Sequence, residues 1–230
     1  EILRLPSFEE IQGEAARLMP ATLLLERQVH EGAWAIQACG GRSVVFAPPA
    51  APLTTAEMDR LYGLPFARAP HPAYPEAIPA VAMIQFSLSS HRGCSGGCSF
   101  CSLALHQGRR IQSRSQESLL EEAARLTRHP EWDGAITDVG GPTANLWGAR
   151  CRREGRGCRR TSCLAPEICR YLEPDALAQI AMLRAVRGVP GVAHVRLASG
   201  VRHDLALQEP RYLQALAAEF VGGQLKIAPE

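Results

Sequence analysis

The most informative part of the sequence is the stretch His91-Arg92-Gly93-Cys94-Ser95-Gly96-Gly97-Cys98-Ser99-Phe100-Cys101. Its cysteines are separated by three residues and then by two. A cubane iron-sulfur cluster normally takes four thiolates, so three closely spaced ones leave one iron open to a ligand. The two glycines would let the loop fold tightly and expose N–H groups to the cluster sulfurs. A structural zinc site or three buried thiols are the alternatives.

The sequence around this stretch alternates between strand and helix patterns, which is typical of βαβ units with a parallel sheet. Apolar runs predict strands at 82–88, 135–139, 192–198 and 224–228. Helical spacing of apolar residues predicts helices at 116–127, 175–187 and 211–220. The cysteines therefore follow the first strand, at the carboxyl edge where such α/β folds bind ligands.

Upstream of these strands we expect a small α+β lead-in segment at 1–64. Ser7 and Glu10 have the spacing of a capping box, and this helix is expected to end near Pro20. A strand at 43–47 and a helix from Thr54 or Thr55 to residue 61 complete the lead-in. Five prolines make 65–80 a linker, which leaves 81–230 as the core, with an insertion at 146–172.

The composition is that of an ordinary globular protein. Of its 230 residues, 46% are hydrophobic and 21% charged, and the net charge of +2 neither requires nor excludes a nucleic-acid partner. A secretory signal and an apolar run long enough to span a bilayer are both missing, so we expect a soluble, cytoplasmic protein without a membrane partner. Because the chain starts at Glu1 and stops just after an expected strand, we interpret it as part of a longer protein, incomplete as an enzyme.

The cysteine spacing, with an aromatic residue before the last cysteine, resembles the signature of radical S-adenosylmethionine (SAM) enzymes. Residues 101–115 resemble the YgiQ-like family of uncharacterised radical SAM proteins. Further stretches that are similar to this family lie at 138–145, 160–163, 198–204 and 222–230, and the lead-in also looks similar.

This resemblance implies a partial (β/α)6 barrel in which Cys94, Cys98 and Cys101 hold a [4Fe-4S] cluster. It further implies that the cluster binds SAM through its amine and carboxylate and cleaves it with one electron, to methionine and a 5′-deoxyadenosyl radical. The expected partners are SAM, an electron donor such as flavodoxin or ferredoxin, and an unidentified substrate.

Gly140 and Gly141 follow the second strand, where radical SAM enzymes place a Gly-Gly-Glu element whose backbone receives the SAM amine. Here Pro142 replaces the glutamate, so only the backbone contact carries over. The alternative is a plain turn. Thr143 is a further candidate for the same cofactor pocket.

The third strand is followed by Ser199, Arg202 and Asp204, which could present a hydroxyl, a guanidinium and a carboxylate to SAM or substrate. Arginine suits a carboxylate because its planar fork donates two hydrogen bonds. A surface ion pair between Arg202 and Asp204 is the alternative.

Four more cysteines, Cys151, Cys158, Cys163 and Cys169, lie within the insertion. Clustered cysteines in a reducing compartment suggest a second metal, either an auxiliary iron-sulfur cluster or zinc. Their spacing matches no standard zinc knuckle, and unliganded thiols or a redox pair are the alternatives.

The same insertion is rich in arginine, with Arg150, Arg152, Arg153, Arg156, Arg159, Arg160 and Arg170 against Glu154 and Glu167. RNA binding is therefore conceivable, although a solvated face is favoured. The sequence leaves three hypotheses: a radical SAM enzyme, an RNA-modifying member of that class, and a non-catalytic iron-sulfur or zinc module for electron transfer or scaffolding.

Overall fold

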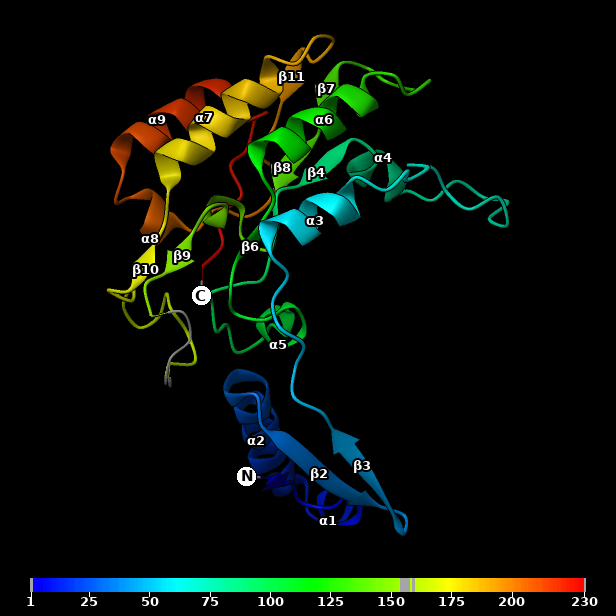
Figure 1. Cartoon of the computed structure of the whole chain (residues 1–230), viewed down its shortest axis with the longest axis vertical. Coiled ribbons are helices and arrows are strands. Elements are labelled where there is room, and N and C mark those ends of the chain that lie inside the picture. The colour runs from blue at the N-terminus through cyan, green and yellow to red at the C-terminus, as the bar shows by residue number, and fades with distance from the viewer. Residues whose placement is uncertain (1, 154–157, 159, 230) are drawn as a thin grey trace.

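The computed structural model describes residues 2–153, 158 and 160–229 (Figure 1). An N-terminal unit forms a three-stranded sheet of order β1-β2-β3. Strand β1 (Ile2–Arg4) pairs parallel to β2 (Trp34–Cys39), which pairs antiparallel to β3 (Arg42–Phe46). The helices of this unit are α1 (Phe8–Gly13), η1 (Ala15–Arg17) and α2 (Leu18–Glu31).

The capping box at the start of α1 is confirmed. The backbone N–H of Glu10 donates to Ser7 Oγ at 3.0 Å, and the N–H of Ser7 donates to the Glu10 carboxylate at 2.7 Å. The predicted end of this helix at Pro20 is wrong, because α1 ends at Gly13 and the proline lies in the first turn of α2. A first turn has no intrahelical partner for its N–H groups, so proline is tolerated there.

The second unit holds the remaining elements (Figure 1). Its helices are α3 (Thr55–Tyr62), α4 (Val81–Ile84), α5 (Leu103–Gln107), α6 (Gln116–Leu126), η2 (Ala144–Leu146), α7 (Ala176–Arg187), α8 (His203–Ala206) and α9 (Pro210–Glu219). Its strands are β4 (Ser87–Ser89), β5 (His91–Arg92), β6 (Gln112–Ser113), β7 (Ala135–Ile136), β8 (Asp138–Gly140), β9 (Arg150–Cys151), β10 (Leu172–Glu173) and β11 (His194–Val195).

The parallel pairing that the sequence predicted is confirmed. Strand β4 pairs parallel to β8, and β7 pairs parallel to β11. The backbone N–H of Val139 in β8 also donates to the carbonyl of Arg196 at 3.1 Å. Strand β8 therefore lies between β4 and the segment that follows β11. Within the described residues the strands form an α/β arrangement that does not close into a barrel.

Three of the predicted strands are shorter than expected, and of 192–198 only His194–Val195 is a strand. Residues 81–84 form α4, and only Ser87–Ser89 of the first strand is extended. A short apolar run does not distinguish strand from helix, and Met83 and Ile84 lie exposed rather than in a sheet. Of 224–228, only Ile227 joins a strand-like pairing, as a single parallel bridge to Val201.

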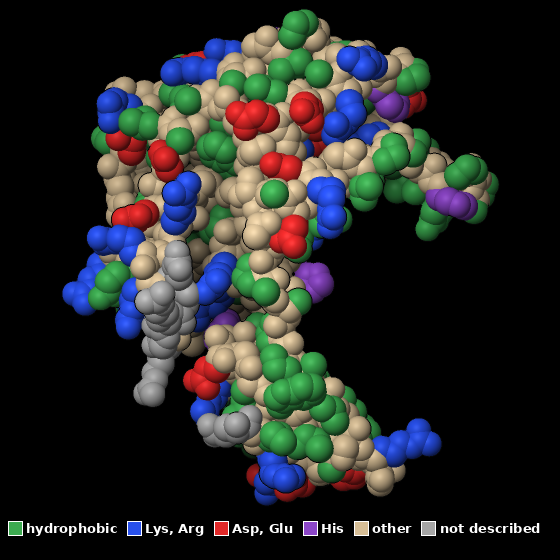
Figure 2. Space-filling view, in the orientation of Figure 1, with side chains coloured by type: hydrophobic (Ala, Val, Ile, Leu, Met, Phe, Trp, Pro, Cys, Tyr) green, Lys and Arg blue, Asp and Glu red, His purple; other side chains and the backbone are tan. Residues whose placement is uncertain are grey.

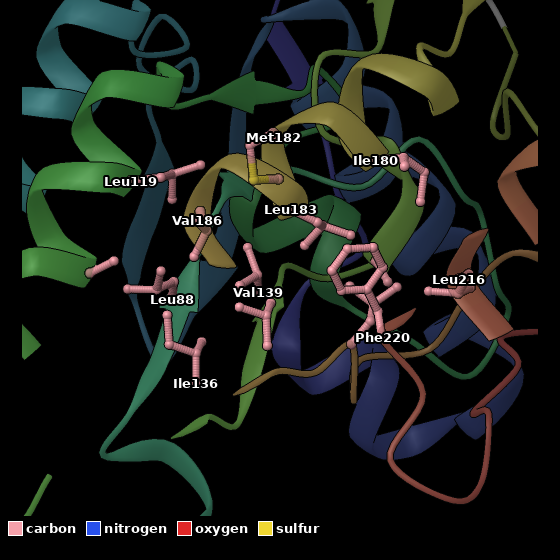
Figure 3. Close-up of a cluster of buried hydrophobic side chains, with 14 of the residues drawn as sticks. Leu88, Leu119, Ile136, Val139, Ile180, Met182, Leu183, Val186, Leu216 and Phe220 are labelled. Atoms are coloured by element: carbon pink, nitrogen blue, oxygen red, sulfur yellow. The ribbon is translucent and has the colours of Figure 1, made fainter. Parts of the chain in front are cut away.

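The predicted helices at 116–127, 175–187 and 211–220 are present as α6, α7 and α9. Their apolar faces pack on the parallel strands (Figure 3). Leu88 and Val139 from the strands lie fully buried beside Leu119, Leu183 and Phe220 from the helices. This core fixes the strand ends, where the candidate site lies.

Buried charges attach the proline-rich segment to the core. Glu122 on α6 pairs with both Arg114 and Arg68. The Arg114 guanidinium is fully buried and also donates to the carbonyl of Ser89 at 3.1 Å, while Arg68 donates to the carbonyl of Ser87 at 2.8 Å. The two arginines and one glutamate therefore hold strand β4 against α6.

Helix α3 packs beside α6 within the second unit. Its N-cap is Thr54, one of the two starts that the sequence predicted, and the Thr54 side chain accepts from the N–H of Glu57 in a capping box. Asp59 of α3 accepts a hydrogen bond from the N–H of Ser115 at 3.0 Å, which anchors the helix beside α6. Over the residues described, every helix is too short or too polar to cross a membrane.

Candidate cluster and cofactor site

The cysteine loop leaves the sheet directly after β5 and folds back on residues 107–110. The N–H of Cys94 donates to the carbonyl of Gly108 at 3.0 Å, and the N–H of Gly93 donates to the Gln107 side chain at 3.1 Å. Gly93 has a φ of +85°, and a Cβ on it would collide with the carbonyl of Arg110. Glycine is therefore required at the entrance to the loop.

Two of the three thiols face the same space. A Cβ placed on Gly96 would lie 3.5 Å from Cys94 Sγ and 3.7 Å from Cys98 Sγ, so glycine keeps the space between them open. The N–H of Cys101 donates to the carbonyl of Cys98 at 3.0 Å, which places the third cysteine on the same turn. Cys94 is buried, whereas the other two are half-buried.

The chemistry of the donor set fits an iron-sulfur cluster. Thiolates are the soft ligands that such clusters take, and Cys94 and Cys98 share the space beside Gly96. In the part of the chain that the structure describes, His, Cys, Asp and Glu side chains are nowhere gathered, three or more together, tightly enough to hold a metal ion.

A cavity of about 290 Å³ lies at the carboxyl ends of β4 and β8. Three of the predicted cofactor residues, Gly140, Gly141 and Ser199, line it, together with His91 and Arg92. The cysteine loop begins at the wall of this cavity. A fourth predicted residue, Thr143, reaches the loop itself, because its hydroxyl lies 3.5 Å from Cys94 Sγ.

Both glycines of this wall are needed for close packing. A Cβ on Gly140 would collide with Ser199 Oγ, and a Cβ on Gly141 would lie 2.5 to 2.8 Å from three atoms of the His91 ring. Ser199 is fixed by Asp138, whose carboxylate accepts from its hydroxyl and from its N–H at 3.1 Å. The wall is thus built from ends of three parallel segments.

His91 was missed by the sequence analysis, although it stands three residues before Cys94 at the end of a strand. Its side chain is buried, and its Nδ1 lies 2.9 Å from Ser90 Oγ. Burial lowers the pKa of His91 to about 4, although the carbonyl of Thr143 opposes this fall. The imidazole is therefore neutral at pH 7.

Arg202 and Asp204 form an ion pair behind the cavity rather than on its wall. Arg202 is buried, its N–H donates to the Asn145 side chain at 2.8 Å, and its carbonyl accepts from the same amide at 3.0 Å. Burial alone would raise the pKa of Asp204, but hydrogen bonds from Arg202 and from the N–H of Leu205 outweigh it and lower the pKa. The main chain of Arg202 therefore holds Asn145, in the turn that follows Thr143.

The cysteine-rich insertion folds onto the cysteine loop, because the N–H of Cys163 donates to the carbonyl of Ser95 at 2.8 Å. Cys151, Cys158, Cys163 and Cys169 all line one further cavity, of about 770 Å³. Arg109 donates to Cys158 Sγ at 3.8 Å.

The pKa values of two thiols in this cavity, Cys158 and Cys163, are shifted in opposite directions. The pKa of Cys158 is lowered, first by the backbone N–H of Arg160 and then by the charge of Arg109. Burial raises the pKa of Cys163.

The basic residues of the insertion gather on the side of the molecule where β9 and β10 lie (Figure 2). Arg152 pairs with Glu173 at 3.0 Å, and the guanidinium groups of Arg153 and Arg170 lie 5.2 and 4.8 Å from the centre of the Tyr171 ring. Arg160 instead donates to backbone carbonyls within the insertion. Arg156, Arg159 and Glu154 lie outside the described residues.

Comparison with known proteins gives consistent results. A family model described as Radical SAM N-terminal matches residues 1–87. A UPF0313 protein of Geobacter sulfurreducens is 48% identical over the whole chain, and one of Methanocella arvoryzae is 46% identical. The UPF0313 protein YgiQ of Escherichia coli is 45% identical over 98% of the chain. The chain spans 38%, 39% and 31% of the length of these relatives, respectively.

Proposed function

The chain belongs to the YgiQ-like UPF0313 family of radical SAM proteins, and we propose on this premise that it carries the cluster loop and part of the SAM site of a radical SAM enzyme. The observation that carries the proposal is the position of the Cys94 loop, which begins at the wall of the strand-end cavity. The substrate is not identified by the family relationship or by the fold.

In this proposal Cys94, Cys98 and Cys101 each bind one iron of a [4Fe-4S] cluster, and SAM occupies the neighbouring cavity. When bound and reduced, the cluster supplies the electron that cleaves SAM to methionine and a 5′-deoxyadenosyl radical. The backbone of Gly140 and Gly141 and the hydroxyl of Ser199 would orient SAM, since all three line the cavity. Thr143 would contribute a hydrogen bond to the Cys94 sulfur.

Arg202 would act on this site through its main-chain hydrogen bonds to Asn145 rather than by touching SAM, and Asp204 would pair with its guanidinium. The electron donor, such as flavodoxin or ferredoxin, would approach the side of the loop where Phe100 is 81% exposed and its neighbour Cys101 is half-buried. All eight cysteines are free of disulfides. In this proposal the protein works in the cytoplasm, where disulfides are rare.

We further propose that the insertion binds a second metal through Cys151, Cys158, Cys163 and Cys169, as an auxiliary iron-sulfur cluster or as zinc. The support is that all four line one cavity, and because they are not gathered tightly enough in the described structure to hold one ion, the metal would have to draw them together. The backbone N–H of Arg160 lowers the pKa of Cys158 most. The charges of Arg109 and Arg153 lower it further, and positive charge of this kind offsets the charge of thiolate ligands.

The direct test is anaerobic reconstitution of the full-length protein, followed by reduction and addition of SAM. The wild type and a Cys39→Ala control, whose cysteine lies in the N-terminal unit, should release 5′-deoxyadenosine, and Cys98→Ala should not. A loaded, reduced wild type that yields no 5′-deoxyadenosine contradicts the proposal and favours an electron-transfer or scaffold module.

RNA modification is the second candidate, because two arginines lie beside the ring of Tyr171, and an aromatic ring with nearby positive charge suits a base and its phosphate. Binding of RNA with a steep dependence on salt, lost in Arg153→Gln and Arg170→Gln, would favour it. Salt-independent or absent binding would leave the arginines as a solvated face.

A further inference from the structure

Two neighbouring side chains of the strand-end cavity, Arg92 and Tyr62, offer hydrogen-bond donors without acceptors. Arg92 is exposed, Tyr62 is half-buried, and both line the cavity. The Nε of Arg92 donates to the hydroxyl oxygen of Tyr62 at 3.2 Å. Over the residues that the structure describes, the terminal nitrogens of Arg92 and the hydroxyl hydrogen of Tyr62 have no protein acceptor. The pair therefore presents donors to the cavity, which is the chemistry that binds an anion.

The side chain of Tyr62 is held in place before any ligand binds. The guanidinium carbon of the buried Arg114 lies 4.3 Å from the centre of the Tyr62 ring and covers one of its faces. Arg125 donates to the backbone carbonyl of Tyr62 at 2.9 Å. A ligand that meets the hydroxyl therefore does not have to order the tyrosine, which favours binding.

The charged groups around Tyr62 leave an excess of positive charge. Four guanidinium groups lie near its side chain: Arg68, Arg92, Arg114 and Arg125. Among the described residues, Glu122 pairs with two of these arginines, and Asp59 lies near one. Two carboxylates therefore stand against four arginines, and the field on this side of the cavity attracts anions.

Arg114 places Tyr62 at the free edge of β4. Phe86 and Ser90 bond to the β8 side of this strand, and neighbouring residues of a strand alternate in direction, so the carbonyl of Ser89 points away from β8. Arg114 donates to that carbonyl at 3.1 Å and also covers the Tyr62 ring. Tyr62 therefore lines the cavity from the side of β4 that faces away from β8.

The residues proposed for SAM lie toward the opposite side. Gly140 ends β8, Gly141 follows it, and Ser199 belongs to the segment after β11, beyond β8. When SAM occupies this side, the donors of Arg92 and Tyr62 remain for a second molecule.

We propose that Arg92 and Tyr62 form a substrate subsite that binds an anionic group, a carboxylate or a phosphate, beside the cofactor. The two terminal nitrogens of Arg92 bind two oxygens of this group, and the hydroxyl of Tyr62 donates to it. The inference rests on the proposed function, because that function assigns the other side of the cavity to SAM. It makes the substrate an anionic small molecule.

Chemical labelling of arginine tests the subsite in the full-length, cluster-loaded protein without reductant. Phenylglyoxal modifies exposed arginines, and mass spectrometry follows Arg92. The control is Arg60, an exposed residue of α3 that is not among the described residues lining the cavity. Inorganic phosphate and acetate, added to the SAM-saturated protein, are the probes for the two anionic groups. We expect at least one probe, above its Kd, to slow the modification of Arg92 about 3-fold or more and to leave Arg60 unchanged.

The same labelling experiment distinguishes the sources of the anion. Protection of Arg92 by phosphate alone or by acetate alone identifies the group as a phosphate or a carboxylate. Protection by SAM, with no further effect of either probe, assigns Arg92 to the carboxylate of SAM and overturns the inference. Equal rates with and without every ligand show a solvated charge and also overturn it.

Two substitutions separate the subsite from the SAM site. Tyr62→Phe keeps the ring against Arg114 and removes only the hydroxyl, so the protecting probe should bind about 10-fold more weakly. Arg92→Gln should bind labelled SAM, in equilibrium dialysis, as tightly as the wild type. A loss of SAM affinity in Arg92→Gln overturns the inference, and undiminished protection in Tyr62→Phe removes Tyr62 from the subsite. Unaltered iron content and melting temperature exclude misfolding in both variants.

The two proposals fail differently. If the wild type binds no SAM, the proposed function itself fails, and labelling of the SAM-free protein still shows whether the pair binds an anion. If the wild type binds SAM and neither probe protects Arg92, only the substrate subsite is overturned.

Discussion

The backbone N–H of Cys163 donates a hydrogen bond to the carbonyl oxygen of Ser95 at 2.8 Å, so the cysteine-rich insertion is attached directly to the loop between Cys94 and Cys98. Gly97 forms the other half of the contact, since a Cβ there would lie 2.8 Å from the carbonyl oxygen of Thr161. The shape of the cluster loop therefore depends on the insertion.

Gly97→Ala should disturb this contact and lower iron binding. The added methyl group meets backbone on the far side, which cannot move as a side chain can, so we expect a loss of about 1–3 kcal/mol in stability. Iron per protein after reconstitution and thermal unfolding measure the two effects. Gly13→Ala is the matched control, because a Cβ there has no atom within 4 Å among the described residues. Equal iron content in the two variants would show that iron binding by the cysteine loop does not depend on its contact with the insertion.

If the insertion binds a second metal as proposed, replacing one of its cysteines should lower the metal content selectively. Cys163→Ala removes a thiol from the insertion cavity but keeps its backbone hydrogen bond to Ser95. We expect total metal per protein to fall while the cluster absorbance of the Cys94 loop remains, whereas Cys39→Ala should change neither. Metal analysis of the three proteins makes the comparison, and an unchanged total in Cys163→Ala would leave the cysteines as unliganded thiols.

Glu122→Ala should be among the most destabilising single changes in the second unit. It leaves the fully buried Arg114 without its carboxylate, and removing one partner of a buried ion pair costs about 3–5 kcal/mol. Glu121→Ala, at the neighbouring exposed position on α6, is the control. Urea denaturation measures the difference, and near-equal midpoints for the two variants would show that the buried pair contributes little.

The depressed pKa of His91 predicts a specific dependence on pH. In the unfolded chain the imidazole binds a proton below about pH 6.5, whereas in the folded protein it does so only below about pH 4. The folded state therefore loses stability as the pH falls through this window. Each pKa unit corresponds to about 1.4 kcal/mol, so the loss between pH 7 and pH 4.5 should be about 2–3 kcal/mol smaller in His91→Asn. Urea denaturation of the metal-free full-length protein at both pH values measures it.

The exposed His71 provides the control for this experiment. His71→Asn should lose as much stability on acidification as the wild type. A His91→Asn protein that loses as much as the wild type would mean that His91 does not titrate on unfolding.

The sequence predicted those features that have a local cause. Helices α6, α7 and α9 could be placed because their apolar spacing is regular and caps such as Ser115 and Asp175 begin them. Helix α2 was missed because Pro20 suggested a helix end, although the same residue is compatible with a first turn.

The candidate site also contains residues that the sequence identifies and residues that only the folded structure brings together. Cys94, Cys98 and Cys101 are recognisable because their spacing is fixed within one loop, and Gly140, Gly141 and Ser199 because they follow apolar strands. His91 depends on contacts with Ser90 and Gly141 that only the folded chain contains. Likewise, the contact between Cys163 and Ser95 joins segments whose distance in the sequence gives no indication of it.

The parallel pairing of β4 with β8 also sets the order in which the site forms during folding. Ser90 and Gly140 are 50 residues apart in the chain, and Asp138 and Ser199 are 61 apart, so the cavity requires two long loops to close. The three thiols of the cysteine loop lie within eight residues and need no such closure. Since contacts between distant residues form more slowly than local ones, a newly made chain presents its thiols before the cavity for the cofactor exists.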